Sequence, residues 1–229
     1  MAMSAVDRLA LPGTGMAATL DKIDSHKLTK RQREVLDAAL GLLVEQGDRL
    51  TMTGVARRAH CSKETLYKWF GDRSGLLVAT VQWQAAKVKA EPVPGDVIDR
   101  ETLKSYIGEF THSLLTVLAG DVSVALNRLA ISHAASGADD LGEVVLANGR
   151  HALGRRLKPV LEAGKRAGLL RFADAEMTYQ TLFGLTVRDI QIRLLLGDRL
   201  DLSPKSLSEQ AARAAEQFFA LYGREKSGL

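Results

Sequence analysis

Residues 51–70, with the sequence TMTGVARRAHCSKETLYKWF, hold the pattern that decides the fold. Thr51 is a preferred residue for capping the start of a helix. His60 and Cys61 interrupt that helix, and Ser62 is placed to cap the start of a second one. The stretch therefore predicts two short helices joined by a tight turn.

The second of these helices carries many polar and basic side chains, namely Ser62, Lys63, Thr65, Tyr67 and Lys68. In a helix-turn-helix, the second helix lies in the major groove of DNA and the first crosses the phosphate backbone. A solvated helix face has a similar composition, so the cluster alone decides little. Combined with the caps and the turn, it predicts that the segment binds double-stranded DNA.

Two kinds of DNA contact are expected. Phosphate contacts position a protein without reading sequence, and the residues predicted for them are Thr51, Ser62, Tyr67, Lys68 and Arg73. Lysine suits guanine acceptors, threonine suits the thymine methyl group, and glutamate accepts from cytosine. The residues predicted to face base edges are Thr53, Lys63, Glu64 and Thr65.

Composition favours an all-α protein. The chain has 229 residues, of which 46% are apolar, and residues with high helix propensity predominate. The formal charge is +4, and the segment 27–73 alone has a surplus of the same size, because it holds ten Lys/Arg and six Asp/Glu. A local basic surplus favours a polyanionic partner.

Several other classes of function lack sequence support. A single cysteine excludes an internal disulfide and fits a cytoplasmic setting, and no apolar run is long enough for a membrane span. The five histidines show no spacing typical of a metal site, and no Walker loop, HExxH or GxSxG motif is present. Residues 13–18 (GTGMAA) formally fit a dinucleotide fingerprint, but no predicted strand precedes them. We therefore expect no metal, no cofactor, no membrane partner and no enzymatic activity.

The chain divides into three predicted parts. Residues 1–26 show no sustained period and are expected to form a disordered tail, followed by a helix-turn-helix domain over 27–73. Thr29 and Gln32 have the spacing of a capping box, which predicts that the first helix of this domain starts there. A helical domain is predicted for 74–229, with a break at Glu91–Asp96 (EPVPGD) and a helix capped by Asp174 that continues to about Leu196. About nine helices are expected in total.

The stretch from Arg33 to Leu77 resembles the N-terminal domain of the TetR family of bacterial transcriptional regulators. The matching positions are Ala38-Ala39, Val55-Ala56, the run Ser62-x-x-Thr-Leu-Tyr-x-x-Phe70, Arg73 and Leu76. The run Asn127–Ser132 (NRLAIS) and Gly168-Leu169-Leu170 look like the AefR-like branch of the family. The chain departs from the family pattern at His60-Cys61, where Gly-Val is usual. Histidine can adopt a left-handed backbone at some cost, so we expect the turn to survive.

The resemblance implies a homodimer that forms through the last two helices. Small and aromatic residues on these helices suit close packing, and those expected at the seam are Leu182, Leu185, Ile190, Ala211, Ala212, Ala214, Ala215, Phe218, Phe219 and Tyr222. The resemblance also implies a repressor released by a small-molecule inducer bound in the C-terminal half. The candidate pocket residues are Trp83, Tyr106, Phe110, His112, Asn127, His133, Phe183 and Arg188.

Alternatives remain open at this stage. The chain could be a constitutive DNA-binding protein without an inducer, or an enzyme that uses a helical scaffold. Cys61 could be a thiol switch, although a small residue packed between helices is the favoured interpretation. His112 and His133 could meet as ligand contacts or a metal pair, although hydrogen-bonded histidines are favoured, and Arg188 could bind an anionic ligand or pair with Asp189.

Overall fold

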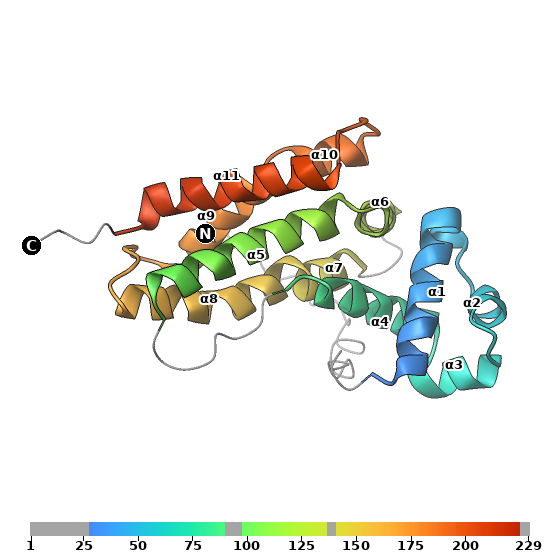
Figure 1. Ribbon diagram of the computed structural model, residues 1–229. Coiled ribbons are helices and arrows are strands. Elements are labelled where there is room, and N and C mark those ends of the chain that lie inside the picture. The colour runs from blue at the N-terminus through green and yellow to red at the C-terminus, as the bar shows by residue number, and fades with distance from the viewer. Residues whose placement is uncertain (1–27, 90–97, 137–140, 225–229) are drawn as a thin grey trace, which may run out of the picture.

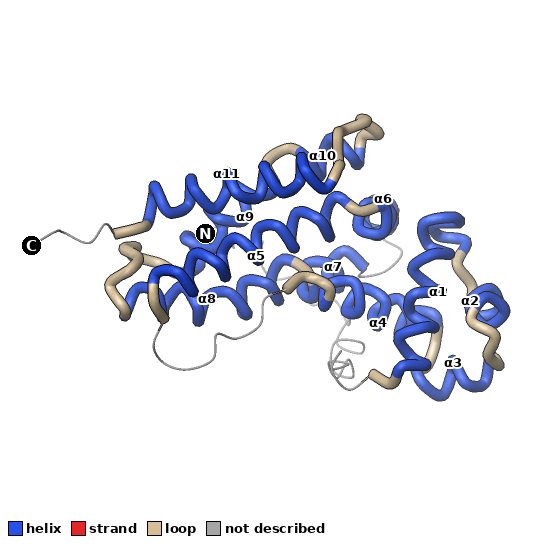
Figure 2. Tube along the Cα trace, viewed as in Figure 1, coloured by secondary structure: helices blue, strands red, loops and turns tan. Residues whose placement is uncertain are grey.

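The structure, a computed structural model, describes residues 28–89, 98–136 and 141–224. These ranges are helical throughout apart from connecting turns and one isolated antiparallel bridge between Leu170 and Gly223 (Figure 2). The all-α fold is therefore confirmed. The predicted tail over 1–26 and the EPVPGD break at 91–96 lie outside the described residues.

Eleven α-helices and one 3-10 helix are found in the described ranges (Figure 1). They are α1 (Lys30–Gln46), η2 (Gly47–Arg49), α2 (Met52–Arg58), α3 (Lys63–Phe70), α4 (Arg73–Ala86), α5 (Arg100–Ala119), α6 (Asp121–Ser136), α7 (Leu141–Asn148), α8 (Arg150–Arg166), α9 (Ala175–Val187), α10 (Ile190–Leu195) and α11 (Pro204–Tyr222). The two short helices α7 and α10 account for the difference from the expected nine.

The first helices start where the sequence predicts. Thr29 and Gln32 form a capping box at α1, in which each side chain accepts a hydrogen bond from the other residue's backbone N–H. Thr51 Oγ1 accepts from the backbone N–H of Gly54 at 3.1 Å and begins α2. Ser62 Oγ accepts from the backbone N–H of Thr65 at 3.2 Å and begins α3. Local capping thus fixes the boundaries of the helix-turn-helix.

The turn between α2 and α3 has the left-handed backbone that was expected of it. His60 has φ +50°, a region that glycine occupies with less strain. Arg31 of α1 supports the turn, because its Nη2 donates to the carbonyl oxygen of His60 at 3.0 Å and to that of Ala59. Cys61 donates its backbone N–H to Ala56 at 3.0 Å and packs, partly buried, against the core. The survival of the turn is confirmed.

Two hydrophobic cores organise the helices, and they do not follow the two halves of the sequence. The first core joins α1, α2, α3 and α4 to one side of α6 and the start of α7. Its contribution from α6 and α7 consists of Leu126, Leu129, Ala130 and Leu141. The second core is formed mainly by α5, α8, α9 and α11, and α11 packs along α5 and α9. Figure 1 shows α2 and α3 at one end of the molecule, with α4 leading back from them. The predicted functional division at residue 73 therefore differs from the division of the packing.

The helix predicted to run from Asp174 to about Leu196 is interrupted. Asp174 caps its start as expected, by accepting from the backbone N–H of Met177 at 2.7 Å. At Arg188 the backbone turns to φ +48°, and α10 begins two residues later. Val187 and Ile190 are buried on either side of the break, Val187 in the second core and Ile190 in a third, smaller apolar cluster with residues of α5 and α11. Because of the bend, the two apolar residues pack in different places. The apolar period of the sequence alone predicts one continuous helix and does not indicate the bend.

The strain at His60 leads to a stability prediction. Replacing His60 with Gly removes the side-chain clash of the left-handed conformation, and we expect the free energy of unfolding to rise by about 0.5–1 kcal/mol. Arg57→Gly is the matched control, because Arg57 is exposed on the right-handed helix α2 and glycine should lower stability there by about 0.5–1 kcal/mol. Urea denaturation measures both. A loss of stability in both variants would contradict the strain at residue 60.

Candidate nucleic-acid interface

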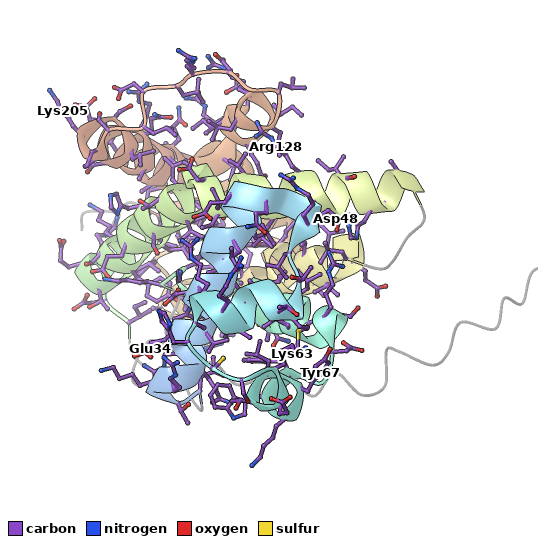
Figure 3. The ribbon with its side chains drawn as sticks, turned by 90° about the vertical axis from the view of Figure 1, so that its right-hand side faces the viewer. Glu34, Asp48, Lys63, Tyr67, Arg128 and Lys205 are labelled. Carbon is purple, nitrogen blue, oxygen red and sulfur yellow. The ribbon has the colours of Figure 1, made fainter. Side chains whose placement is uncertain are left out.

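The helix α3 has one buried face and one exposed face. Leu66 and Phe70 are buried in the first core, at 0% and 7% exposure. The opposite face carries Lys63, Glu64, Tyr67 and Lys68, all exposed. Figure 3 shows the end of the molecule that holds the helix-turn-helix, with Lys63 and Tyr67 on it. Burial of two apolar residues thus fixes which side chains α3 presents outward.

The lysines on the exposed face of α3 have no bonding partner in the described residues. Within the described residues, neither Lys63 nor Lys68 forms a hydrogen bond or an ion pair. Tyr67 is 51% exposed, and its hydroxyl likewise makes no hydrogen bond to the described part of the chain. Unpaired lysines and an exposed phenol are suited to phosphate oxygens and base edges.

The other predicted residues on α3 also serve its N-terminus. Ser62 Oγ lies 3.0 Å from Thr65 Oγ1, besides accepting from the backbone of Thr65. The pKa of Glu64 is lowered, first by a hydrogen bond from its own backbone N–H and then by one from Ser62. Glu64 therefore stays ionised near the start of a helix, where negative charge is favourable. Because the hydroxyl groups of Ser62 and Thr65 are hydrogen-bonded at the start of α3, fewer groups are free to bind DNA than composition suggests.

Arg73 has a structural role that was not predicted from the sequence. Its Nε donates to the carbonyl oxygen of Leu50 at 3.0 Å, and its Nη2 donates to the Asp48 carbonyl at 2.9 Å and carboxylate at 2.7 Å. The guanidinium of α4 is therefore bound to the segment that precedes the Thr51 cap. A phosphate contact by Arg73 stays a prediction, and it would have to share these donors.

Asp48 also accepts a bond from His133 of α6. His133 Nε2 lies 3.0 Å from Asp48 Oδ1, the same oxygen that Arg73 uses. The hydrogen bonds from His133 and then Arg73 hold the pKa of Asp48 below its usual value. The favoured interpretation of His133 as a hydrogen-bonded residue is thus confirmed.

Two basic residues near the turn also escaped sequence reasoning. Arg57 lies one helical turn beyond Thr53 on α2, is exposed, and forms no ion pair within the described residues. The spacing of four from Thr53 is the signal that could have identified it. Arg58, its neighbour, instead pairs with Glu45 of α1 at 2.7 Å and so braces the two helices.

The eight candidate pocket residues do not converge on one place. Phe110 is buried in the second core, against which Tyr106 and Phe183 pack. Trp83 packs on the first core and donates to Asp37 of α1 at 2.8 Å. His112 and Arg188 are exposed, and Asn127 donates to the Ser123 carbonyl at 2.7 Å within α6. Asp189 lies 3.9 Å from Arg193, and Arg188 forms no ion pair within the described residues.

The residues expected at a dimer seam are mostly inside the protomer. Those that are 9% exposed or less, and so pack within the protomer, are Leu182, Ile190, Ala211, Ala214, Ala215 and Phe218. Their part in a seam stays a prediction, because small and aromatic residues at helical spacing suit a core equally well. The C-terminal helices instead expose Met177, Ile192, Leu196 and Leu221.

Metal binding and membrane spanning find little support in the described ranges. No group of three or more His, Cys, Asp or Glu side chains is placed to hold a metal ion there. No single helix in these ranges is long and apolar enough to cross a membrane, although the bent pair Arg100–Ala119 and Asp121–Ala135 passes by length and composition.

Comparison with known proteins identifies both parts of the chain. Residues 35–80 match the family described as bacterial regulatory proteins, tetR family, and residues 106–224 match the AefR-like transcriptional repressor, C-terminal domain. Comparison with curated protein sequences gives no match.

Solved structures share the fold over most of the chain. A TetR transcriptional regulator from Agrobacterium tumefaciens is 46% identical, with a TM-score of 0.73 over 87% of this chain and 97% of that one. A putative TetR-family regulator from Mesorhizobium loti is 23% identical, with a TM-score of 0.68 over 86% and 100%. The flavonoid-responsive regulator FrrA is 23% identical, with a TM-score of 0.61 over 85% and 98%. With its helix-turn-helix, its AefR-like second domain and this likeness to a solved regulator, the chain belongs to the TetR family of DNA-binding transcriptional regulators, which is not a family of enzymes.

Proposed function

We propose that the protein is a sequence-specific repressor that binds its operator as a homodimer and is released by a small-molecule inducer. The observation that carries the DNA-binding part is the exposed face of α3, where Lys63, Tyr67 and Lys68 have no partner in the described residues. Lys68 and Tyr67 would hold phosphates, and Lys63, at the first position of α3, would reach base edges. Thr53 and Arg57 on α2 extend the same surface.

A homodimer is supported by the distribution of exposed apolar side chains. Eight large hydrophobic residues are exposed in the described ranges, and four of them, Met177, Ile192, Leu196 and Leu221, belong to the C-terminal helices α9, α10 and α11. A concentration of exposed apolar surface is typical of an interface. Gly184, exposed on α9, has open space where a side chain would lie and would let a partner helix approach closely. Two-fold pairing also gives the two α3 helices a palindromic operator to bind.

An inducer is supported by a buried polar group between α4 and α6. Gln84 is 8% exposed, and its Nε2 donates weakly to Ser123 Oγ at 3.4 Å. Its Oε1 has no hydrogen-bond partner, which costs about 1–3 kcal/mol for a buried acceptor. Asn127 lies one helical turn beyond Ser123 on the same face of α6. A ligand that carries an O–H or N–H donor would satisfy this oxygen, at the contact between α4 and α6.

Substitutions on α3 should separate positioning from sequence reading. Lys68→Ala should weaken binding to all DNA sequences and reduce the slope of affinity against salt by about one, and Tyr67→Ala should weaken binding to all sequences too. Lys63→Ala should instead change the preference among operator variants, by about 1–3 kcal/mol at one base pair. Fluorescence anisotropy with operator fragments selected from a random library measures each effect.

The control for these variants is Lys205→Ala. Lys205 is 86% exposed on α11, far from the helix-turn-helix, and should leave affinity and its salt dependence unchanged. Equal losses for Lys63, Lys68 and Lys205 would show that only net charge matters and would exclude the proposed roles.

The dimer seam is tested by placing charge on it. Met177→Glu and Leu221→Glu should each shift the protein from dimer to monomer in sedimentation equilibrium, because a carboxylate buried in an interface without a partner is strongly unfavourable. Leu146→Glu is the matched control, because Leu146 is exposed to a similar degree but lies on α7. A dimer that survives both seam variants would place the interface elsewhere.

The inducer is tested by a thermal-shift screen of hydroxylated aromatic compounds, which carry the donor that Gln84 Oε1 lacks. A compound that raises the melting temperature should also weaken operator binding, because it stabilises the conformation that does not bind DNA. Gln84→Leu should lose both responses and still bind the operator. A protein that binds DNA identically in the presence of every stabilising compound would be a constitutive binder, the alternative function.

A further inference from the structure

His133 lies on the buried face of α6, among apolar residues. Leu126, Leu129 and Ala130 precede it at spacings of seven, four and three, so all four residues lie on one side of the helix. The three apolar residues pack in the first core, and the His133 side chain is 6% exposed. The face of α6 that carries the helix-turn-helix therefore ends in a polar, hydrogen-bonding group rather than a fourth apolar one.

The imidazole is joined to the helix-turn-helix by a hydrogen bond to the Asp48 carboxylate. Asp48 Oδ1 accepts from His133 of α6 at 3.0 Å and from Arg73 of α4 at 2.7 Å. The Asp48 side chain is 63% exposed, so the Arg73 pair alone is a surface ion pair, of a kind that contributes about 0–1 kcal/mol. The bond between Asp48 and His133 differs from this ion pair because the His133 side chain is buried. Water reaches the imidazole poorly and so cannot easily replace this bond.

Asp48 belongs to the short segment that sets the start of α2. The segment η2 (Gly47–Arg49) is followed by Leu50, which is 1% exposed, and by Thr51, whose side chain caps α2. Arg73 holds the carbonyl oxygens of Asp48 and Leu50 from the other side. The position of this segment therefore determines where α2 begins, and α3 follows α2 through the turn at His60.

The far side of α6 is attached to the C-terminal helices. Arg128 donates through Nη2 to the Leu194 carbonyl at 2.8 Å and through Nε to the Leu195 carbonyl at 3.3 Å, at the end of α10. Figure 3 shows Arg128 and Asp48 on the same end of the molecule, beside α6 and the helix-turn-helix respectively. Helix α6 thus connects α10, near which apolar residues are exposed, with the segment before α2.

We propose that His133 is a positioning residue for DNA recognition, which acts through Asp48 to hold α2 and α3 in the orientation that fits the operator. A local displacement of η2 from α6 would break this bond and release the segment before α2, while Leu126, Leu129 and Ala130 keep α6 packed in the first core. The inference rests on the DNA-binding function of the family and does not require an inducer.

A double-mutant cycle on full-length protein tests the inference. The variants are His133→Leu, Asp48→Ala and the double variant, and the probe is an operator fragment selected by the wild-type protein. Each single variant should raise the operator Kd by about three- to tenfold. The double variant should be no weaker than Asp48→Ala, because Asp48→Ala already removes the bond to His133 together with the Arg73 pair. Measurement at a temperature where every variant is fully folded, as judged by circular dichroism, separates this effect from lost stability.

Two further readouts distinguish positioning from a general role in packing. His133→Gln retains an N–H donor and should bind the operator more tightly than His133→Leu. Backbone amides of residues 51–58 should exchange hydrogen faster in His133→Leu, whereas those of α8 should not change. The control Glu176→Gln breaks an ion pair between α8 and α9, Lys158–Glu176 at 2.8 Å, and should leave Kd unchanged.

The outcomes that overturn the inference are distinct from those that overturn the proposed function. A wild-type protein that selects no operator would remove the DNA-binding proposal itself. If the wild-type protein binds and His133→Leu binds equally well, or if the two single variants have additive effects, His133 does not position the helix-turn-helix. If His133→Leu does not fold, Asp48→Ala and His133→Gln still decide the question, since Asp48 is largely exposed.

Discussion

The packing of α6 against the helix-turn-helix is the constraint on which the rest of the structure depends. Leu126, Leu129 and Ala130 of α6 share a core with Leu66 and Phe70 of α3. A helix-turn-helix of this size buries too little apolar surface to be stable alone. Its apolar side chains therefore pack against helices that lie far along the sequence. As a result, the exposed face of α3 cannot be reoriented without repacking α6, or without moving the first core as a unit.

The sequence predicted those parts of the fold that local physics decides. The capping box at Thr29, the caps at Thr51 and Ser62, and the left-handed turn at His60 all depend on groups a few residues apart, so residue type and spacing were sufficient. The amphipathic pattern of α3 likewise separated Leu66 and Phe70 from the exposed lysines. Of the candidate site, the sequence thus identified the surface, although the DNA contacts themselves stay predictions.

The parts that the sequence did not predict depend on contacts between distant residues. Arg73 and His133 both bind Asp48, from 25 and 85 residues away, and no local pattern indicates which partner a polar side chain chooses. The alanines of α11 illustrate a second reason. Ala211 and Ala214 have the spacing of a close helix contact, but that spacing cannot distinguish α5 and α9 of the same chain from a partner subunit.

The two cores give a physical reason why the proposed inducer would influence DNA binding. Each core is close-packed and resists deformation. The long hydrogen bond of Gln84, and its Oε1 without a partner in the described residues, lie between α4 and α6, two helices of the first core. A bound molecule would therefore move the cores relative to each other more easily than it would distort either one. Since α6 and α7 pack with the first core and α9 and α11 with the second, such a movement would change the separation between the exposed face of α3 and the C-terminal helices through which we propose that subunits pair.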